Sequence, residues 1–145
     1  MLFSKRQGGC FVDGRVLMPQ IRLGLVGTNG SGKSSASSYL VEKGFVWLSL
    51  SDVVRETVSK KGLSESRETL IATANQLKAE HGQDFLARKA FESAMALNHP
   101  RVVFDSIRNI AEVQYLVGHG VQMIGIDAPT ELRFSRISSR RRPGD

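Results

Sequence analysis

The sequence predicts an α/β fold, in which helices pack on both faces of a parallel β-sheet. Three observations support this prediction. Short apolar runs alternate with longer amphipathic stretches, as in folds built from strand and helix units around a buried sheet. A glycine-rich turn at 27–32 follows the first long apolar run and opens an amphipathic stretch. The 145 residues, 41% of them hydrophobic, suffice for one domain with one sizeable core.

The expected elements follow from these patterns. Apolar runs predict strands at 21–26, 45–49, 101–105 and 121–127. Amphipathic stretches predict helices at 33–43, from Ser51 onward, 65–81, from Asp84 to about 97, 110–118, and from about Pro129 into an arginine cluster. Ser51 is the expected N-cap of the second helix. Trp47, within the second strand, is expected to be a core residue.

The two ends of the chain differ from this pattern. Residues 1–17 contain glycines and mixed charge without lasting periodicity, so we expect a disordered extension outside the fold or a mis-assigned start. Met18 immediately precedes the first strand and is a candidate for the natural start. Residues 18–145 are expected to form the domain, with 143–145 as a loop.

Composition narrows the class of protein. The single cysteine, Cys10, cannot form an internal disulfide bond. We find no long apolar run and no hydrophobic segment behind a basic start, so we expect a cytoplasmic protein with no membrane partner. The net charge is +6, and the densest basic run lies at 133–142. Such a cluster suits an anionic partner, either a nucleotide or a nucleic acid.

The segment 27–34, GTNGSGKS, fits the pattern of Gly, four residues, then Gly-Lys-Ser. Its position between a strand and a helix is the one that phosphate binding requires. Glycines let backbone amides turn toward phosphate oxygens, and the helix N-terminus adds positive potential. The sequence therefore predicts a P-loop for a purine nucleoside triphosphate, preferably ATP with Mg²⁺.

Each part of the P-loop has an expected role. Lys33 is expected to bridge the β- and γ-phosphates, and Ser34 to ligate Mg²⁺. Backbone amides are expected to bind the phosphate chain at Asn29, Gly30, Ser31, Gly32, Lys33, Ser34 and Ser35.

Asp105 ends the third predicted strand. In parallel sheets, ligands bind at the carboxyl ends of the strands, so Asp105 is expected to hold Mg²⁺, through water, or to contact an acceptor. The alternative is that Asp105 caps the following helix. Ser106 or Asn109 can provide that cap instead.

Several arginines are candidates for further phosphate contacts, because the guanidinium fork suits phosphate oxygens. Arg108 follows Asp105, and Arg55 lies three residues beyond Asp52. Solvent-exposed arginines are the alternative for both. On the last helix the spacing of three and four places three side chains on one face, Arg133, Arg136 and Arg140. A cationic helix end that favours the helix dipole is the alternative there.

These segments resemble the nucleoside monophosphate kinase family and its relative dephospho-CoA kinase. SLSDVVRETV at 49–58 is similar to the family segment whose Asp and Arg face the acceptor nucleotide. FDSIRNIAEVQYL at 104–116 is similar to the strand that ends in Asp, followed by an arginine on the acceptor phosphate. FSRISSRRR at 134–142 resembles the helix that leads into the mobile lid. The segment DSIRN at 105–109 is most similar to the corresponding segment of an uncharacterised nucleotide-kinase branch, whose members are also found fused to deoxycytidylate deaminases.

The resemblance implies a P-loop NTPase sandwich of three layers, with about four parallel strands in the order 2-3-1-4. It implies catalytic roles for Lys33, Asp105, Arg136 and Arg140, a metal site at Ser34 and Asp105, and acceptor binding by Asp52, Arg55 and Arg108. The family continues through a lid and a last strand, so we expect the domain at 18–145 to be C-terminally incomplete, with both missing.

The expected function is transfer of the γ-phosphoryl group of MgATP to a nucleoside monophosphate or a similar small phosphorylated acceptor. The alternative is a regulatory module, or a fragment of a larger protein, that binds ATP without efficient turnover. The expected partners are small nucleotide substrates, with a larger fusion partner or an oligomer also possible. Nucleic acid is a less favoured partner, because the basic helix lacks interleaved aromatic residues. Three separate histidines at helix ends or in loops do not suggest a metal site: His81, His99 and His119.

Overall fold

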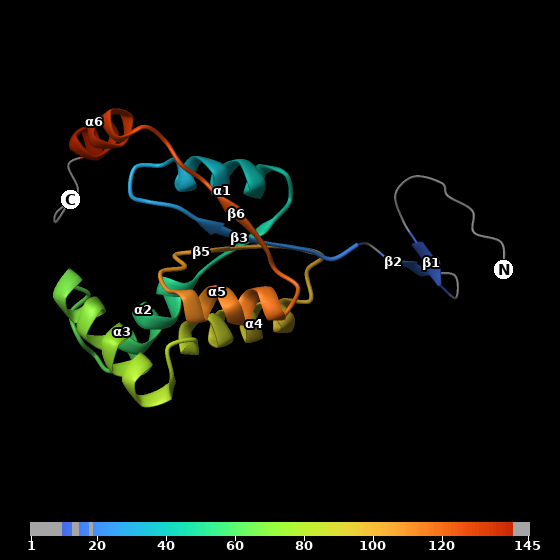
Figure 1. Ribbon diagram of the computed structural model, residues 1–145. Coiled ribbons are helices and arrows are strands. Elements are labelled where there is room, and N and C mark those ends of the chain that lie inside the picture. The colour runs from blue at the N-terminus through green and yellow to red at the C-terminus, as the bar shows by residue number, and fades with distance from the viewer. Residues whose placement is uncertain (1–9, 13–14, 18, 141–145) are drawn as a thin grey trace.

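A four-stranded parallel sheet forms the centre of the molecule (Figure 1). The structure, a computed structural model, describes residues 10–12, 15–17 and 19–140. The strands of the sheet are β3 (Ile21–Val26), β4 (Val46–Ser49), β5 (Arg101–Asp105) and β6 (Gln122–Gly125). Their spatial order is β4-β5-β3-β6, and all three pairings are parallel. This arrangement confirms the predicted fold class and the order 2-3-1-4.

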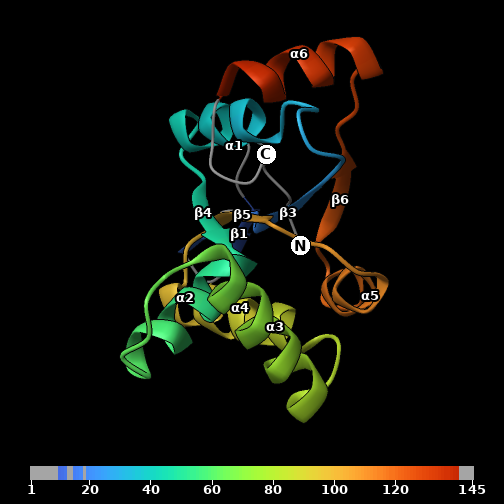
Figure 2. The same cartoon turned by 90° about the vertical axis from the view of Figure 1, so that its left-hand side faces the viewer.

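Helices cover both faces of the sheet, which makes three layers (Figure 2). Helices α1 and α6 lie on one side, and α2 to α5 lie on the other. Their bounds are α1 (Lys33–Glu42), α2 (Leu50–Lys60), α3 (Arg67–His81), α4 (Phe85–Leu97), α5 (Ile110–Gly118) and α6 (Thr130–Arg140). Within the described residues, none of these helices has the length and apolar content that a membrane crossing requires.

Each face of the sheet has its own hydrophobic core. On the α1 side, Leu23, Leu25 and Val103 pack against α1. On the other side, Phe104 and Val102 pack beneath helices α2, α4 and α5. Alternate residues of β5 thus enter opposite cores, as expected for a strand buried on both faces.

The strand register determines which residues meet at the ligand edge. Ser49 at the end of β4 pairs with Asp105 at the end of β5. At the centre of the sheet, Val26 ends β3 and pairs with Gly125 of β6. The segment after β3 and the segment after β5 therefore leave the sheet at the same edge, because the strands are parallel.

Two sequence predictions are wrong, one about the N-cap of the second helix and one about Trp47 in the second strand. Helix α2 begins at Leu50, and its N-cap is Ser49, whose Oγ accepts a hydrogen bond from the amide of Ser51 at 3.3 Å. Trp47 is not a core residue, since 43% of its surface is exposed. Strand β4 is an edge strand, so the face that carries Trp47 is only partly covered.

A second sheet, not predicted from the sequence, consists of the antiparallel strands β1 (Cys10–Val12) and β2 (Arg15–Leu17). It pairs with no strand of the central sheet. The predicted start at Met18 and the rest of the predicted extension, at 1–9 and 13–14, lie outside the described residues, as do the predicted loop at 143–145 and the arginines at 141 and 142. The division into an extension and a domain stays a prediction.

Candidate functional site

The P-loop forms the turn between β3 and α1. Its backbone has a shape that only glycine allows at key points: Gly30 has φ of 75°, and a Cβ there would lie 2.7 Å from the carbonyl oxygen of Arg133. At Gly27, a Cβ would lie 2.1 Å from the carbonyl oxygen of Ile126. The loop therefore lies between the residue that follows β6 and helix α6, and side chains larger than hydrogen would open it.

Lys33, the first residue of α1, folds back over the loop. Its Nζ donates hydrogen bonds to the carbonyl oxygens of Gly27 at 2.6 Å and Thr28 at 2.8 Å. Burial lowers the pKa of Lys33, and the positive charges of Arg108 and Arg140 lower it further, while Asp105 opposes them. These four groups, from three separate segments of the chain, thus act on one another through space. A polyanion placed among them would neutralise the excess positive charge.

The loop also contains a buried hydroxyl group without a partner. Ser31 is 4% exposed, and among the described residues no atom forms a hydrogen bond with its Oγ. An unsatisfied buried polar group costs about 1–3 kcal/mol. In addition, Gly32 precedes α1 without a side-chain cap, so the first amides of the helix are available to an anion. The glycine cradle, the hydroxyl and the helix end together fit a phosphate chain.

The predicted metal ligands, Ser34 and Asp105, both line the cleft above the P-loop. Hydroxyl, carboxylate and phosphate oxygens are the ligands that Mg²⁺ prefers, so this pair fits a metal bound jointly with a nucleotide. Among the described residues, no group of three His, Cys, Asp or Glu side chains is arranged to hold a metal by itself.

Asp105 does not cap the helix that follows it. Its Oδ1 accepts a hydrogen bond of 2.6 Å from the amide of the next residue, Ser106, which has a left-handed backbone with φ of 64°. Asn109 caps α5 instead, through a capping box with Glu112. The structure therefore favours the expectation that Asp105 is available to a ligand.

Glu112, which no sequence pattern had singled out, supports the loop bearing Arg108. Glu112 is 1% exposed, and its Oε2 accepts hydrogen bonds from the amides of Arg108 at 2.7 Å and Asn109 at 3.2 Å. Its Oε1 lies 3.1 Å from Nζ of Lys78 on α3. The Asn-x-x-Glu spacing of a capping box is a signal that could have identified it. Arg108 itself lines the cleft, as predicted.

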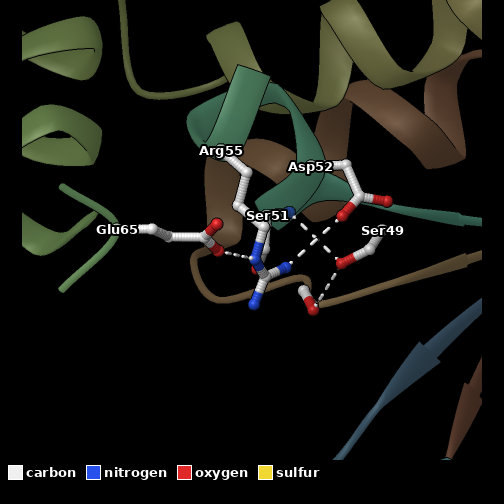
Figure 3. A network of polar contacts seen from close by, with 6 residues as sticks. Ser49, Ser51, Asp52, Arg55 and Glu65 are labelled. Atoms are coloured by element: carbon white, nitrogen blue, oxygen red, sulfur yellow. Dashed lines mark hydrogen bonds and ion pairs between the residues drawn. The ribbon is translucent and has the colours of Figure 1, made fainter. Parts of the chain in front are cut away.

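On the β4 side, Arg55 of α2 lines the cleft, whereas Asp52 contacts Arg55 (Figure 3). Nη1 of Arg55 lies 3.3 Å from Oδ1 of Asp52, and Nε donates a 2.7 Å hydrogen bond to Oε1 of Glu65. Ser49 links α2 to the β5 loop, because its Oγ donates to Oγ of Ser106 at 2.9 Å. Asp52 was predicted to bind an acceptor directly; its contact in the structure is with Arg55.

Helix α6 covers the opposite side of the cleft. Nη1 of Arg136 donates a 3.0 Å hydrogen bond to the carbonyl oxygen of Gly30. Arg136 and Arg140 line the cleft with Ser135 and Ser139, so the predicted basic face is directed at the P-loop. Arg133 differs from them, since its Nε donates to the carbonyl oxygen of Ala128 at 3.0 Å.

All these elements surround one cleft of about 840 Å³, a size typical of small-molecule sites. The P-loop, the end of β5, the start of α2 and the inner face of α6 each contribute side chains. Trp47 and Ile107 supply apolar surface to it. Asp52 and Arg133 do not line the cleft, whereas the other predicted site residues do: Asn29, Gly30, Ser31, Gly32, Lys33, Ser34, Ser35, Arg55, Asp105, Arg108, Arg136 and Arg140.

Comparison with known proteins gives relatives that match most of this chain and are longer than it. A UPF0200 protein of Methanosarcina barkeri is 33% identical over 126 residues, which cover 85% of this chain and 68% of the relative. A UPF0200 protein of Methanosarcina mazei is 35% identical, with 85% and 67% covered. A family model described as an AAA domain matches residues 23–145. The chain belongs to the UPF0200 family and carries this AAA domain.

The fold of this UPF0200 chain also has a counterpart among solved structures. The crystal structure of TT1252 from Thermus thermophilus aligns with a TM-score of 0.57 and 22% identity, covering 85% of this chain and 73% of that one. At that identity the likeness shows the fold alone. Family and fold together identify a P-loop domain.

Proposed function

We propose that this chain transfers the γ-phosphoryl group of MgATP to a nucleoside monophosphate or a similar small phosphorylated acceptor. One observation carries the proposal: cations from three segments approach one P-loop and leave a cleft between them. Lys33, Arg108 and Arg140 lie close enough that each arginine lowers the pKa of the lysine. Mutual repulsion of this kind is relieved when two phosphorylated substrates bind between the cations.

The donor half of the site is the P-loop. The amides at 29–35 and the hydroxyl of Ser31 bind the phosphate chain, and Lys33 exchanges its carbonyl partners for the β- and γ-phosphate oxygens. Ser34 and Asp105 hold Mg²⁺, which neutralises phosphate charge and orients the γ-phosphoryl group. This fits the two residues' positions in the cleft.

The acceptor half lies on the β4 and β5 side. Arg55 and Arg108 bind the phosphate of the acceptor and orient one of its oxygens toward the γ-phosphorus. That oxygen forms the new P–O bond as the bond between the γ-phosphorus and the β–γ bridging oxygen breaks. The products are ADP and the acceptor extended by one phosphate.

Helix α6 supplies the remaining charge. Arg136 and Arg140 face the cleft from the side opposite Arg55, so their guanidinium groups stabilise the γ-phosphoryl oxygens during transfer. Because Arg136 also bonds to Gly30, α6 stays in contact with the P-loop.

The experiment is ADP release from MgATP with a panel of nucleoside monophosphates and dephospho-CoA. We expect turnover that requires one acceptor and is lost in Lys33→Ala. Lys43→Ala, which removes a lysine at the other end of the same helix, is the matched control and is expected to keep activity. Tight ATP binding without acceptor-dependent ADP would overturn the transferase proposal and favour a nucleotide-sensing module.

A further inference from the structure

The guanidinium group of Arg55 already holds a carboxylate at the edge of the cleft. Its Nε donates a 2.7 Å hydrogen bond to Oε1 of Glu65, while Nη1 contacts Asp52 at 3.3 Å (Figure 3). The two acids come from different places: Asp52 lies one turn earlier on α2, and Glu65 lies in the connection 61–66 that joins α2 to α3. Arg55 is thus held by its own helix and also by a separate segment.

Glu65 differs from Asp52 in where it lies, since it is outside both helices. The two side chains are almost equally exposed, at 55% for Glu65 and 56% for Asp52. The ion pair it forms is correspondingly weak, because exposed pairs contribute little in water. The connection 61–66 can therefore release Arg55 without unfolding a helix.

We propose that Glu65 is an internal competitor that occupies the arginine intended for the acceptor's phosphate. A carboxylate and a phosphate present similar pairs of oxygens to a guanidinium fork, so one can replace the other. When a phosphorylated acceptor binds, its phosphate takes Nε of Arg55 from Glu65, and Asp52 keeps the guanidinium in place through Nη1. This inference rests on the proposed function, since it specifies how the acceptor half of the same site is controlled.

The exchange has a consequence for selectivity. An acceptor must replace Glu65 before it gains Arg55, so a ligand without a phosphate cannot make the exchange. The dianionic phosphate carries more charge than the carboxylate and forms stronger hydrogen bonds with arginine. Glu65 thus excludes anions that bind Arg55 more weakly than a carboxylate does, lowers the affinity for phosphate monoesters, and does not affect uncharged nucleosides.

The test is the affinity of the full chain for AMP, GMP, CMP and UMP, measured by calorimetry without ATP. In Glu65→Gln and Glu65→Ala the competitor is removed, so we expect the best-binding monophosphate to bind about two- to fivefold more tightly, the range set by a weak exposed ion pair. The matched control is Glu56→Gln, which removes an exposed acid that pairs with Lys60 on the same helix. It is expected to leave the affinity unchanged.

A gain of affinity separates this role from a merely structural one, because loss of support for Arg55 would weaken binding. The corresponding nucleoside is the second comparison, and its binding is expected to be unaffected by either Glu65 substitution. Unchanged or weaker monophosphate binding in both Glu65 variants would overturn the proposal, as would an equal gain for the nucleoside or the absence of monophosphate binding to all proteins.

The experiments distinguish a failure of the competitor role of Glu65 from a failure of the proposed function. MgATP binding and its dependence on Lys33 are measured in the same preparations and involve the opposite side of the cleft. If acceptor-dependent ADP release is found but the Glu65 variants gain no affinity, only the competitor role is wrong. If ADP release is absent while the gain is present, the transferase proposal fails and the anion exchange stands.

Discussion

Arg136 and Gly30 connect the last helix to the centre of the P-loop: Nη1 of Arg136 lies 3.0 Å from the carbonyl oxygen of Gly30. The two residues are 106 positions apart in the chain. The contact holds a cation beside the predicted phosphate site and braces the loop at the same time.

Arg136→Ala is expected to lower kcat/KM for phosphoryl transfer by about 10- to 100-fold, because it removes the charge-assisted contact that we propose with the transferred group. The free energy of unfolding is expected to change by less than about 1 kcal/mol, since Arg136 is exposed. Steady-state kinetics and denaturant titration check both parts. Arg136→Lys keeps the charge but loses the fork, and should recover only part of the rate. Full activity in the alanine variant would exclude a catalytic role.

Gly30→Ala is expected to abolish tight nucleotide binding. A left-handed backbone costs an alanine about 1–2 kcal/mol, and the new Cβ would meet the carbonyl oxygen of Arg133 at 2.7 Å. The loop and α6 must then separate. Calorimetry with MgATP measures the loss. Gly62→Ala is the control, since Gly62 has a similar φ of 65° but no atom within 4 Å of the added Cβ. Equal affinities in the two variants would contradict the described contact of α6 with the loop.

The lowered pKa of Lys33 predicts a stability change at alkaline pH. In the window just below the ordinary value of 10.5, the unfolded chain binds more protons at this site than the folded chain. The free energy of unfolding should therefore rise with pH in this window, relative to Lys33→Met, which lacks the group. Denaturant unfolding of both proteins between neutral pH and the end of the window tests this. A difference between the two curves that stays constant or falls would show that the pKa is not lowered.

Trp47 offers a direct report on the cleft, because it is the chain's only tryptophan and lines the site. Ligand binding is expected to reduce its exposure and shift its emission to shorter wavelength. Fluorescence titration with MgATP and with monophosphates measures this change, and Trp47→Phe serves as the blank. If calorimetry detects binding and the emission stays constant, the ligand does not approach Trp47.

Glu112→Ala is expected to destabilise the fold by about 3–5 kcal/mol, since it leaves Lys78 without its buried partner. It also removes the acceptor of the Arg108 and Asn109 amides. Glu112→Gln preserves one such acceptor and should lose less. Thermal or urea unfolding gives the comparison. Wild-type stability in the alanine variant would mean that Glu112 does not support this loop.

Most of the architecture and the donor half of the site could be predicted from the sequence. Hydrophobic periodicity and the GTNGSGKS segment sufficed for four strands and the P-loop, because these depend on local patterns. The strand order came from the resemblance to the nucleoside monophosphate kinase family. The spacing of Arg136 and Arg140 correctly placed both on one helix face. These residues line the cleft as expected.

The errors arose where the answer depends on neighbours distant in sequence. An apolar side chain in a strand is usually buried, and Trp47 is exposed only because β4 is at the edge of the sheet. Likewise, the choice of Ser49 over Ser51 as the cap of α2 depends on where β4 ends. The contact of Glu65 with Arg55 joins a loop to a helix, and no periodicity in the sequence signals it.

Phosphoryl transfer is tested most directly by phosphorus NMR of the chain with MgATP and the acceptor that supports ADP release. We expect that the γ-phosphorus signal of ATP disappears as a β-phosphate signal of the phosphorylated acceptor grows equally, and that Lys33→Ala shows neither change. Release of inorganic phosphate with the acceptor left unmodified would contradict phosphoryl transfer and assign this cleft to ATP binding and hydrolysis.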